Sequence, residues 1–161
     1  MKDAYEKIEE IIAKKYGSST TSRKNIGDFM LSSMEAVDVK SNNIAKNNFS
    51  PNMVSAKKVF DYLKEDNLLY FIFVDYEIKN NKIHILEESD LIPINYIDWS
   101  CLSIQCQGNG VIQKSKPLKV VQQSVNSWIE GLKQAYSVYI EKERTKLLNL
   151  ERHLELAKNN S

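Results

Sequence analysis

Apolar residues follow two different spacings along the chain, and the first of these spacings predicts helices. Residues 2–16 repeat apolar side chains every three to four positions, which is the period of an amphipathic helix. The same period follows Ser50 and Pro51, which suit an N-cap and a first-turn proline, and it predicts a helix through about Glu65. A final helical segment is predicted over about residues 120–158.

The second spacing, alternation of apolar and polar residues, predicts the strands. A run rich in β-branched and aromatic residues, "LLYFIFVDYEI", is the best candidate for a central strand. The predicted strands cover residues 26–31, 35–41, 68–78, 82–87 and 100–106, with a short strand after the turn "QGNG". Helices and strands alternate irregularly, which favours an α/β fold with a mixed central β-sheet flanked by helices.

The final helical segment raises two questions of packing. Gly131 interrupts its pattern and is expected to divide it into two helices. Leu147, Leu150, Leu154 and Ala157 recur near heptad spacing. This apolar face can pack on the body of the protein or on a second subunit, and packing on the body is the favoured interpretation.

Length and composition favour one globular domain over residues 1–161. The chain has 161 residues, 42% of them hydrophobic, which is enough to bury a core. No apolar run approaches the roughly 20 residues of a membrane span, and the charged first residues contain no apolar signal segment. Cys101 and Cys106 fit neither a disulfide framework nor a CxxC metal site. We therefore expect a cytoplasmic protein with reduced cysteines and no membrane association.

Charge is unevenly distributed along the sequence. Residues 14–58 and 102–161 carry net positive charge, whereas residues 59–101 between them are acidic. Basic segments are typical of proteins that bind phosphate groups, although an uneven solvated surface explains the same pattern. The sequence contains no P-loop, GxSxG or GxGxxG motif, so nucleotide hydrolysis, hydrolase-elbow and dinucleotide-binding functions have no support.

The segment "EAVDVKS" brings together the residues with the most distinctive chemistry. Side chains alternate in direction along a strand, so Asp38 and Lys40 leave the face opposite to Val37 and Val39. If residues 26–31 pair with this strand as a hairpin, Asp28 lies on the same face as Asp38 and Lys40. Two close carboxylates repel unless a cation lies between them, and carboxylate oxygens suit Mg²⁺. The alternative is an ordinary ion cluster on a half-exposed sheet.

Asp28, followed ten residues later by Asp38-Val39-Lys40, resembles the signature of the PD-(D/E)XK nucleases, above all the compact type II restriction endonucleases. The resemblance covers about residues 1–115 and includes "SPNMVSAKKVFDYL", "LYFIFVDYEI" and "LSIQCQGNGVIQ". Two features depart from the commoner pattern. Gly27, where many members have proline, precedes the first acid, and the second acid is aspartate rather than glutamate.

This resemblance implies a restriction-endonuclease-like fold and a magnesium-dependent enzyme of a restriction-modification system. Such an enzyme cleaves double-stranded DNA at a short, usually palindromic sequence and commonly acts as a homodimer. Asp28 and Asp38 would bind the metal together with the Val39 carbonyl, Lys40 would be the catalytic lysine, and Glu9 would be a further acid from the first helix. Two alternatives remain open: a nuclease of DNA repair or recombination, and a catalytically silent DNA-binding module.

Polar loops supply candidate contacts to DNA. Asparagine, glutamine and lysine side chains can bond base edges and phosphates, and the glycines of "QCQGNG" allow the backbone to approach closely. The alternative for each segment is an ordinary polar loop or hairpin turn. The candidates are Lys24, Asn42, Asn43, Lys46, Asn47, Asn48, Ser50, Asn52, Gln105, Gln107 and Asn109.

Overall fold

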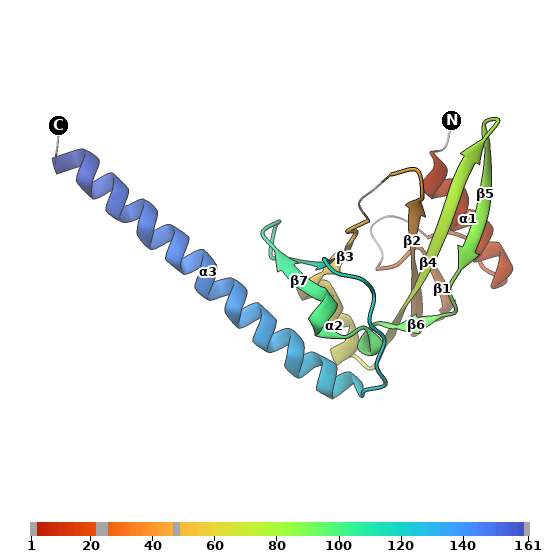
Figure 1. The fold of residues 1–161 in the computed structure, drawn as a ribbon. Helices are drawn as coiled ribbons and strands as arrows, with labels where there is room; N and C mark the ends of the chain where they lie inside the picture. Colours follow the sequence, from red (N-terminus) through yellow and green to blue (C-terminus); the bar gives the residue numbers. More distant parts are fainter. Residues whose placement is uncertain (1–2, 22–25, 47–48, 160–161) are drawn as a thin grey trace.

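The chain adopts an α/β fold in which mixed β-structure is flanked by helices (Figure 1). This is a computed structural model, and it describes residues 3–21, 26–46 and 49–159. The described elements are α1 (Ala4–Lys15), β1 (Phe29–Ser32), β2 (Glu35–Asn43), β3 (Asn52–Ser55), α2 (Ala56–Lys64), β4 (Leu68–Lys79), β5 (Lys82–Glu88), β6 (Ile92–Pro93), two 3₁₀ turns (Ile94–Tyr96 and Trp99–Cys101), β7 (Leu102–Gln105), β8 (Val111–Lys114) and α3 (Val125–Asn159). The predicted α/β class, with a mixed sheet flanked by helices, is confirmed; likeness to the restriction-endonuclease fold remains an expectation.

The larger sheet has strands β2 and β4 at its centre. Its order is β1-β2-β4-β5, and the short strand β6 also pairs with β4. β2 and β4 run parallel over the whole of β2, whereas β1, β5 and β6 are antiparallel to their neighbours. The connection between β2 and β4 includes α2, as a parallel crossover requires.

Helices cover both faces of this sheet, so each face has its own core. On one face, Ile8 and Ile12 of α1 pack with Val37 and Val39 of β2. On the other face, Phe71 of β4 belongs to a second core; its further members include Ala36, Val59, Leu69, Ile112, Trp128 and Leu132. The two faces alternate along β2, as the sequence pattern predicts, and this alternation also sets the direction of Asp38 and Lys40.

A second sheet of three strands, β3-β8-β7, corrects the sequence prediction around Ser50. The predicted helix start at Ser50 and Pro51 is wrong, because the chain first forms β3, which pairs antiparallel with β8. α2 begins at Ala56, and the Ser55 side chain accepts a hydrogen bond from the Lys58 N–H as its N-cap. Through Gln113 and Lys114 of β8, this second sheet also bonds the backbone carbonyls of Ser50 and Pro51.

Gly27 explains why β1 begins at Phe29 and not at residue 26, where the sequence predicts it. Gly27 has a φ of +77°, in the left-handed region that favours glycine, and a Cβ there would lie 2.9 Å from the Val37 carbonyl oxygen. The backbone therefore turns sharply at Gly27 and enters the sheet only after Asp28. This turn places Asp28 directly beside β2.

Helix α3 is continuous through Gly131, so the predicted division is wrong. A Cβ at Gly131 would collide with the indole ring of Trp99, so the glycine permits close packing of helix against ring and does not end the helix. The Trp99 indole N–H also donates to the Trp128 carbonyl oxygen at 3.0 Å. Tertiary packing thus overrides the low helix propensity of glycine.

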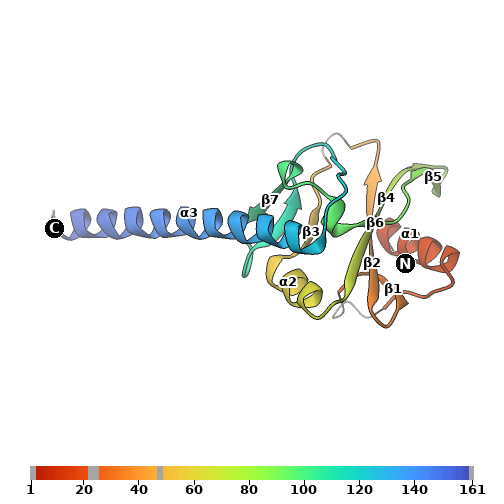
Figure 2. The ribbon, with the colours of Figure 1, turned by 90° about the horizontal axis from the view of Figure 1, so that it is seen from below.

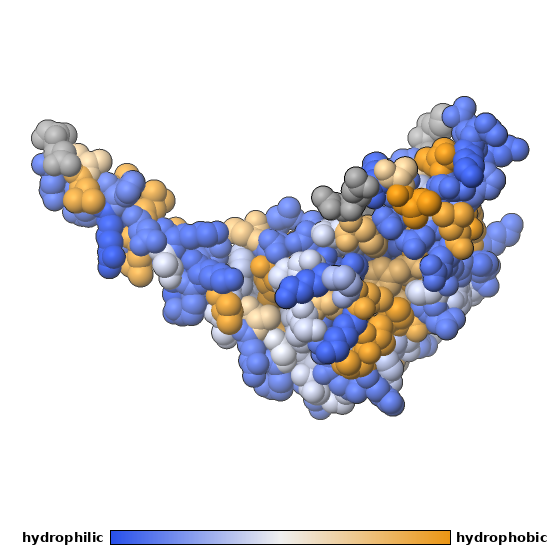
Figure 3. Space-filling model, viewed as in Figure 1, coloured by the Kyte–Doolittle hydropathy of each residue, from blue (hydrophilic) through white to orange (hydrophobic). Residues whose placement is uncertain are grey.

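The second half of α3 projects from the body as an arm (Figures 1 and 2). Leu147, Leu150 and Leu154 are 65, 57 and 64% exposed, so the favoured prediction that they pack on the body is wrong. In the space-filling view, apolar patches are visible along this arm (Figure 3). Within the residues that the structure describes, no helix is both long and apolar enough to span a lipid bilayer.

Candidate active site

Asp28 and Asp38 lie opposite each other across the β1–β2 pair. The register joins Phe29 to Val37, so one step further along the pair Asp28 is opposite Asp38. The Asp28 N–H donates to the Val37 carbonyl oxygen at 2.7 Å, and the Asp28 carboxylate accepts a hydrogen bond from the Val39 N–H at 2.6 Å. These two backbone bonds fix the position of the Asp28 carboxylate. The structure thus brings the two acids together, as strand alternation predicts.

The two carboxyl groups interact directly with each other. A hydrogen bond joins the Asp28 and Asp38 side chains. Burial raises the pKa of Asp38 to about 7; the Lys40 ammonium opposes this shift and the Asp28 carboxylate reinforces it. Burial also raises the pKa of Asp28, although the bond from the Val39 N–H holds it down. Adjacent buried carboxylates of this kind favour either a bound proton or a bound cation.

Lys40 completes a group of three. Its Nζ lies 3.1 Å from Asp38 Oδ1, and the two side chains are 20 and 14% exposed. With so little exposure, Asp38 and Lys40 are not a loose surface ion pair, which would be worth little. The ammonium is held on the same strand face as Asp38, at the edge of a hollow that opens to solvent.

Glu9 approaches the same acids from α1. Burial and, to a smaller extent, the charges of Asp28 and Asp38 raise the pKa of Glu9 to about 7, whereas Lys40 opposes the shift. Glu9 also lines the hollow beside Lys40. Across the described ranges, no three His, Cys, Asp or Glu side chains are close enough to hold a metal ion by themselves. Glu9 therefore interacts with Asp28 and Asp38 through its charge, and it does not complete a three-acid metal site with them.

The hollow has a volume of about 370 Å³, and polar residues form its rim. Five of the predicted DNA contacts line it together with Glu9, Val39 and Lys40; they are Asn42, Asn43, Lys46, Ser50 and Asn52. The Asn42 amide donates to Asp75 Oδ1 at 3.0 Å, which fixes its orientation. The rim thus combines amides, a hydroxyl and an ammonium next to the acid pair.

The second sheet holds the far wall of the hollow in place. The Lys114 N–H donates to the Pro51 carbonyl oxygen at 3.0 Å, and the Gln113 side chain donates to the Ser50 carbonyl oxygen at 3.1 Å. The Lys114 ammonium, in turn, lies 5.5 Å from the centre of the Phe49 ring. β8 therefore holds Ser50 and Pro51 in place, and this is the role of the sheet that the sequence did not predict.

The remaining predicted DNA contacts are placed differently. Gln107 reaches the rim, because its side chain accepts a hydrogen bond from the Asn52 amide at 3.2 Å. Gln105 lines a separate groove between β7 and α3, and the Asn109 carbonyl accepts a hydrogen bond from the Tyr136 hydroxyl of α3. The structure does not bring Gln105 and Asn109 to the hollow. Lys24, Asn47 and Asn48 lie outside the described residues.

Four residues that line the hollow were not predicted as site residues: Tyr5, Ser41, Phe49 and Pro51. Tyr5 belongs to the apolar pattern of the first helix, which favours a core position, but it is 46% exposed. Its spacing of four residues before Glu9 was a usable signal, since such residues share one face of a helix.

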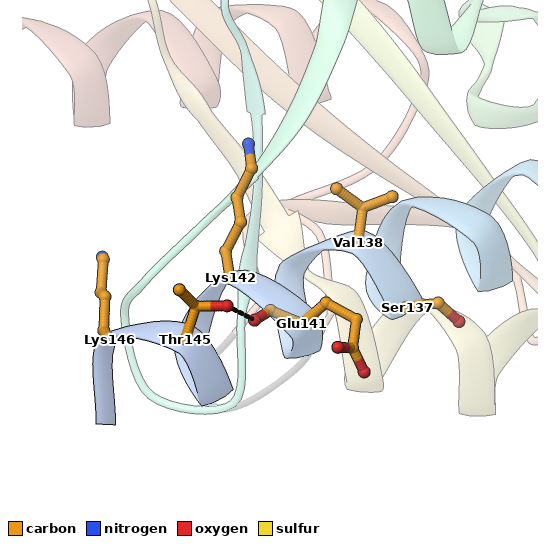
Figure 4. A pocket seen from close by; sticks show the side chains of 6 residues that line it. All are labelled: Ser137, Val138, Glu141, Lys142, Thr145 and Lys146. Atoms are coloured by element: carbon orange, nitrogen blue, oxygen red, sulfur yellow. Dashed lines mark hydrogen bonds between the residues drawn. The ribbon is translucent and has the colours of Figure 1, made fainter. Parts of the chain in front are cut away.

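A hollow on the side of α3 offers no comparable chemistry (Figure 4). It is lined by Ser137, Val138, Glu141, Lys142, Thr145 and Lys146. The Glu141 carboxylate pairs with Arg144 at 3.0 Å, and the Thr145 hydroxyl donates to the Glu141 carbonyl oxygen within the helix. A single, already paired carboxylate does not form a site like that of Asp28 and Asp38.

The raised pKa values predict that metal-free protein loses stability as pH rises through about 7. The pKa of Asp38 rises from 3.8 to about 7 on folding, so the folded state holds this proton more tightly than the unfolded chain. The resulting stabilisation is complete below pH 3.8 and is lost through about pH 7; Glu9 acts in the same direction.

We expect thermal unfolding in EDTA to show a melting temperature several degrees higher at about pH 5.5 than at about pH 8.5. Asp28, Glu9 and Lys40 are the charged groups that interact with Asp38, and only the first two add to the repulsion. A melting temperature that rises over this interval would contradict the described electrostatics of the site.

Comparison with known proteins found no match, so the functional assignment rests on the geometry of the site. No protein-family model matches this chain. No curated protein matches it either.

Proposed function

We propose that this protein is a magnesium-dependent endonuclease of the type II restriction class, acting in the cytoplasm on a short, palindromic sequence of double-stranded DNA. The observation that carries this proposal is the convergence of Asp28, Asp38 and Lys40, with Lys40 at the edge of a hollow rimmed by amides and an ammonium. The resemblance to the PD-(D/E)XK signature involves these same three residues, in the spatial relation that their chemistry needs.

The residues present fit a magnesium ion. Mg²⁺ is typically bound by one or two carboxylates and keeps several waters, so a pair of acids is sufficient. Burial raises the pKa of both aspartates, and the Asp28 charge raises that of Asp38 further, so a cation beside the two carboxylates is favoured. Asp28 and Asp38 would hold the ion, with the Val39 carbonyl as the proposed further ligand. When bound, the ion would stabilise charge on a phosphate oxygen and lower the pKa of a coordinated water.

Lys40 has a separate role in this proposal. Its ammonium is oriented by Asp38 and lies at the edge of the hollow, where a DNA phosphate would enter. From there it would donate to a non-bridging phosphate oxygen and orient the attacking water. Glu9, with its pKa raised to about 7, is placed to accept a proton near neutral pH.

The rim supports sequence recognition next to the point of cleavage. Asn42 and Asn52 present amides that can pair with adenine edges, and Gln107 extends this surface through its bond to Asn52. Lys46 is suited to a phosphate contact. Direct readout beside the acids favours a site-specific enzyme over a nuclease of repair or recombination.

Digestion of phage DNA of known sequence tests the proposal. In Mg²⁺ we expect discrete fragments whose ends map to one short sequence, and we expect no cutting in EDTA. A smear, or a preference for branched substrates, would favour a nuclease of repair or recombination. Binding to duplexes that weakens with salt, without cutting in Mg²⁺ or Mn²⁺, would identify a catalytically silent module.

We also propose that two copies assemble through the α3 arm. A palindromic DNA site has two-fold symmetry, which a homodimer matches with one catalytic centre for each strand. The arm exposes Leu147, Leu150 and Leu154 to water, and a second arm offers the same apolar stripe to cover them.

The double substitution of Leu150 and Leu154 by glutamate is therefore expected to halve the mass measured by light scattering. Buried carboxylates without partners would oppose pairing of the arms. Asn149→Glu, an exposed polar position on the same arm, should leave the mass unchanged. A monomeric parent protein, or a doubly substituted protein that stays dimeric, would refute the arm as the interface.

A further inference from the structure

The Asn52 and Gln107 side chains form a pair of exposed amides at the rim of the hollow, called the amide pair below. Asn52 Nδ2 donates to Gln107 Oε1 at 3.2 Å, although the two residues are 55 positions apart in the sequence. Asn52 lines the hollow, and both residues are exposed. A ligand bound at the hollow can therefore reach both amides.

Hydrogen bonds hold the backbone beneath each amide. Asn52 is paired with Gln113 in the register between β3 and β8. Gln107 belongs to the turn between β7 and β8, where its N–H donates to the Gln105 carbonyl oxygen at 3.0 Å and its own carbonyl accepts from the Gly110 N–H at 2.9 Å. Because both amides stand on anchored backbone and bond each other, their orientation is set before a ligand binds.

The direction of the bond between the two amides leaves them with different free groups. The Gln107 oxygen is turned toward Asn52, so its NH2 group, with two hydrogens, is the part left for a ligand. Asn52 uses one of its two amide hydrogens and keeps its oxygen and the other hydrogen. Gln107 therefore offers donors, whereas Asn52 offers one donor and one acceptor.

These free groups match two different bases in the major groove of DNA. Guanine presents two acceptors, N7 and O6, whereas adenine presents one acceptor, N7, and one donor, the N6 amino group. Gln107 thus fits guanine, and Asn52 fits adenine. The bonded atoms of the amide pair lie 3.2 Å apart, close to the rise of about 3.4 Å between neighbouring base pairs.

We propose that Asn52 recognises an adenine and Gln107 a guanine in the neighbouring base pair. Each half of the recognised sequence would then contain an A·T pair next to a G·C pair. This inference rests on the proposed nuclease function and specifies part of the DNA sequence that its hollow recognises. The amide pair determines specificity, while Asp28, Asp38 and Lys40 act on the phosphate.

Replacement of a purine N7 by carbon tests the two contacts one at a time. The experiment measures binding of the full chain, in EDTA, to duplexes of the sequence mapped by cleavage, with 7-deazaguanine or 7-deazaadenine in place of each purine in turn. For the parent, we expect one guanine and one neighbouring adenine whose replacement weakens binding by about 3- to 10-fold, as for the loss of one hydrogen bond. Gln107→Ala should lose the sensitivity to 7-deazaguanine, and Asn52→Ala the sensitivity to 7-deazaadenine.

Two exposed amides away from the hollow provide matched controls. Gln122→Ala, before α3, and Asn126→Ala, in its first turn, should keep both sensitivities of the parent. All four alanine variants should melt within about 2 °C of the parent, because each changes an exposed side chain.

Asn52→Asp provides the second arm, because it reverses the bond within the amide pair. A carboxylate only accepts hydrogen bonds, so Gln107 would donate to it and turn its oxygen toward the DNA. Gln107 would then offer one donor and one acceptor, and the preferred base at its position should change from guanine to adenine. Sequencing of the duplexes that each protein selects from a random pool measures this change, which a bond with a merely structural role would not cause.

The possible failures are distinguishable. A parent protein that does not cut DNA would remove the proposed function itself. A parent that cuts without sequence preference, or at a sequence with no A·T pair beside a G·C pair, would overturn the recognition by the amide pair and leave the catalytic residues in place. The same holds if N7 replacement has no effect or affects the parent and the two alanine variants equally, or if Asn52→Asp selects the parent's sequence.

Discussion

Asp38→Asn is expected to reduce cleavage of duplex DNA by at least about a thousandfold, because it removes one of the two carboxylates proposed to hold the magnesium ion. The same substitution should stabilise the metal-free protein above about pH 7. Asp38 is buried beside Asp28, and its pKa of about 7 shows that ionisation is unfavourable there. An amide occupies the same volume without the charge.

Single-turnover cleavage and thermal unfolding at about pH 8.5 measure the two effects, and DNA binding in EDTA should survive. Asp61→Asn, at an exposed position on α2, is the matched control and should change neither quantity. If Asp38→Asn cuts DNA at the parent rate, Asp38 is not a catalytic residue. If it cuts poorly but is also unfolded at this pH, the described electrostatics are wrong.

Lys40→Met is expected to reduce cleavage by about 10²- to 10⁴-fold through loss of the ammonium that faces the phosphate. Its effect on stability should have the opposite sign to that of Asp38→Asn. Lys40 holds the pKa of Asp38 down, so without it the buried carboxylate loses its nearest positive charge. We expect a destabilisation of about 1–3 kcal/mol at pH 8.5.

Lys79→Met is a closely matched control for this variant. Lys79 also lies on a strand and pairs with an acid two residues before it, Glu77, at 3.2 Å, but its side chain is 68% exposed. Loss of this pair should cost less than about 1 kcal/mol and leave cleavage unchanged. Equal effects of Lys40→Met and Lys79→Met on cleavage would remove Lys40 from the site.

The candidate site could be predicted from the sequence because its geometry is local. Strand alternation separates Asp38 and Lys40 from Val37 and Val39, and a hairpin with a short turn brings Asp28 alongside. These relations depend only on neighbouring residues and on the pairing of β1 with β2. The alternation of side chains along a strand is therefore sufficient to predict that the three side chains share a face. Long-range packing adds the burial that raises the pKa of Asp38, and no local pattern reveals it.

The errors in the predicted secondary structure have the opposite origin, because they come from contacts between residues far apart in the sequence. Ser50 and Pro51 carry valid helix-start signals, but pairing with β8, more than fifty residues away, draws the next residues into a strand. Gly131 is a valid helix-breaking signal, but contact with Trp99 requires a glycine within the helix. In both places a distant partner decides the local structure.

The leucines of the arm show a different limit. A heptad-like stripe predicts that Leu147, Leu150 and Leu154 pack against something, and it does not identify the surface. The structure excludes the body of the same chain, since all three remain exposed. This exclusion is why the arm enters the proposed dimer.

Anomalous scattering from crystals of the protein soaked with Mn²⁺ tests the central claim most directly, namely that Asp28 and Asp38 hold one cation between them. The account predicts one strong peak within about 2.3 Å of a carboxylate oxygen from each aspartate, on the side of the pair that opens to Lys40 and the hollow. The peak should disappear in Asp38→Asn crystals. A soaked crystal without a peak between these carboxylates, or with the ion bound elsewhere, would contradict the account.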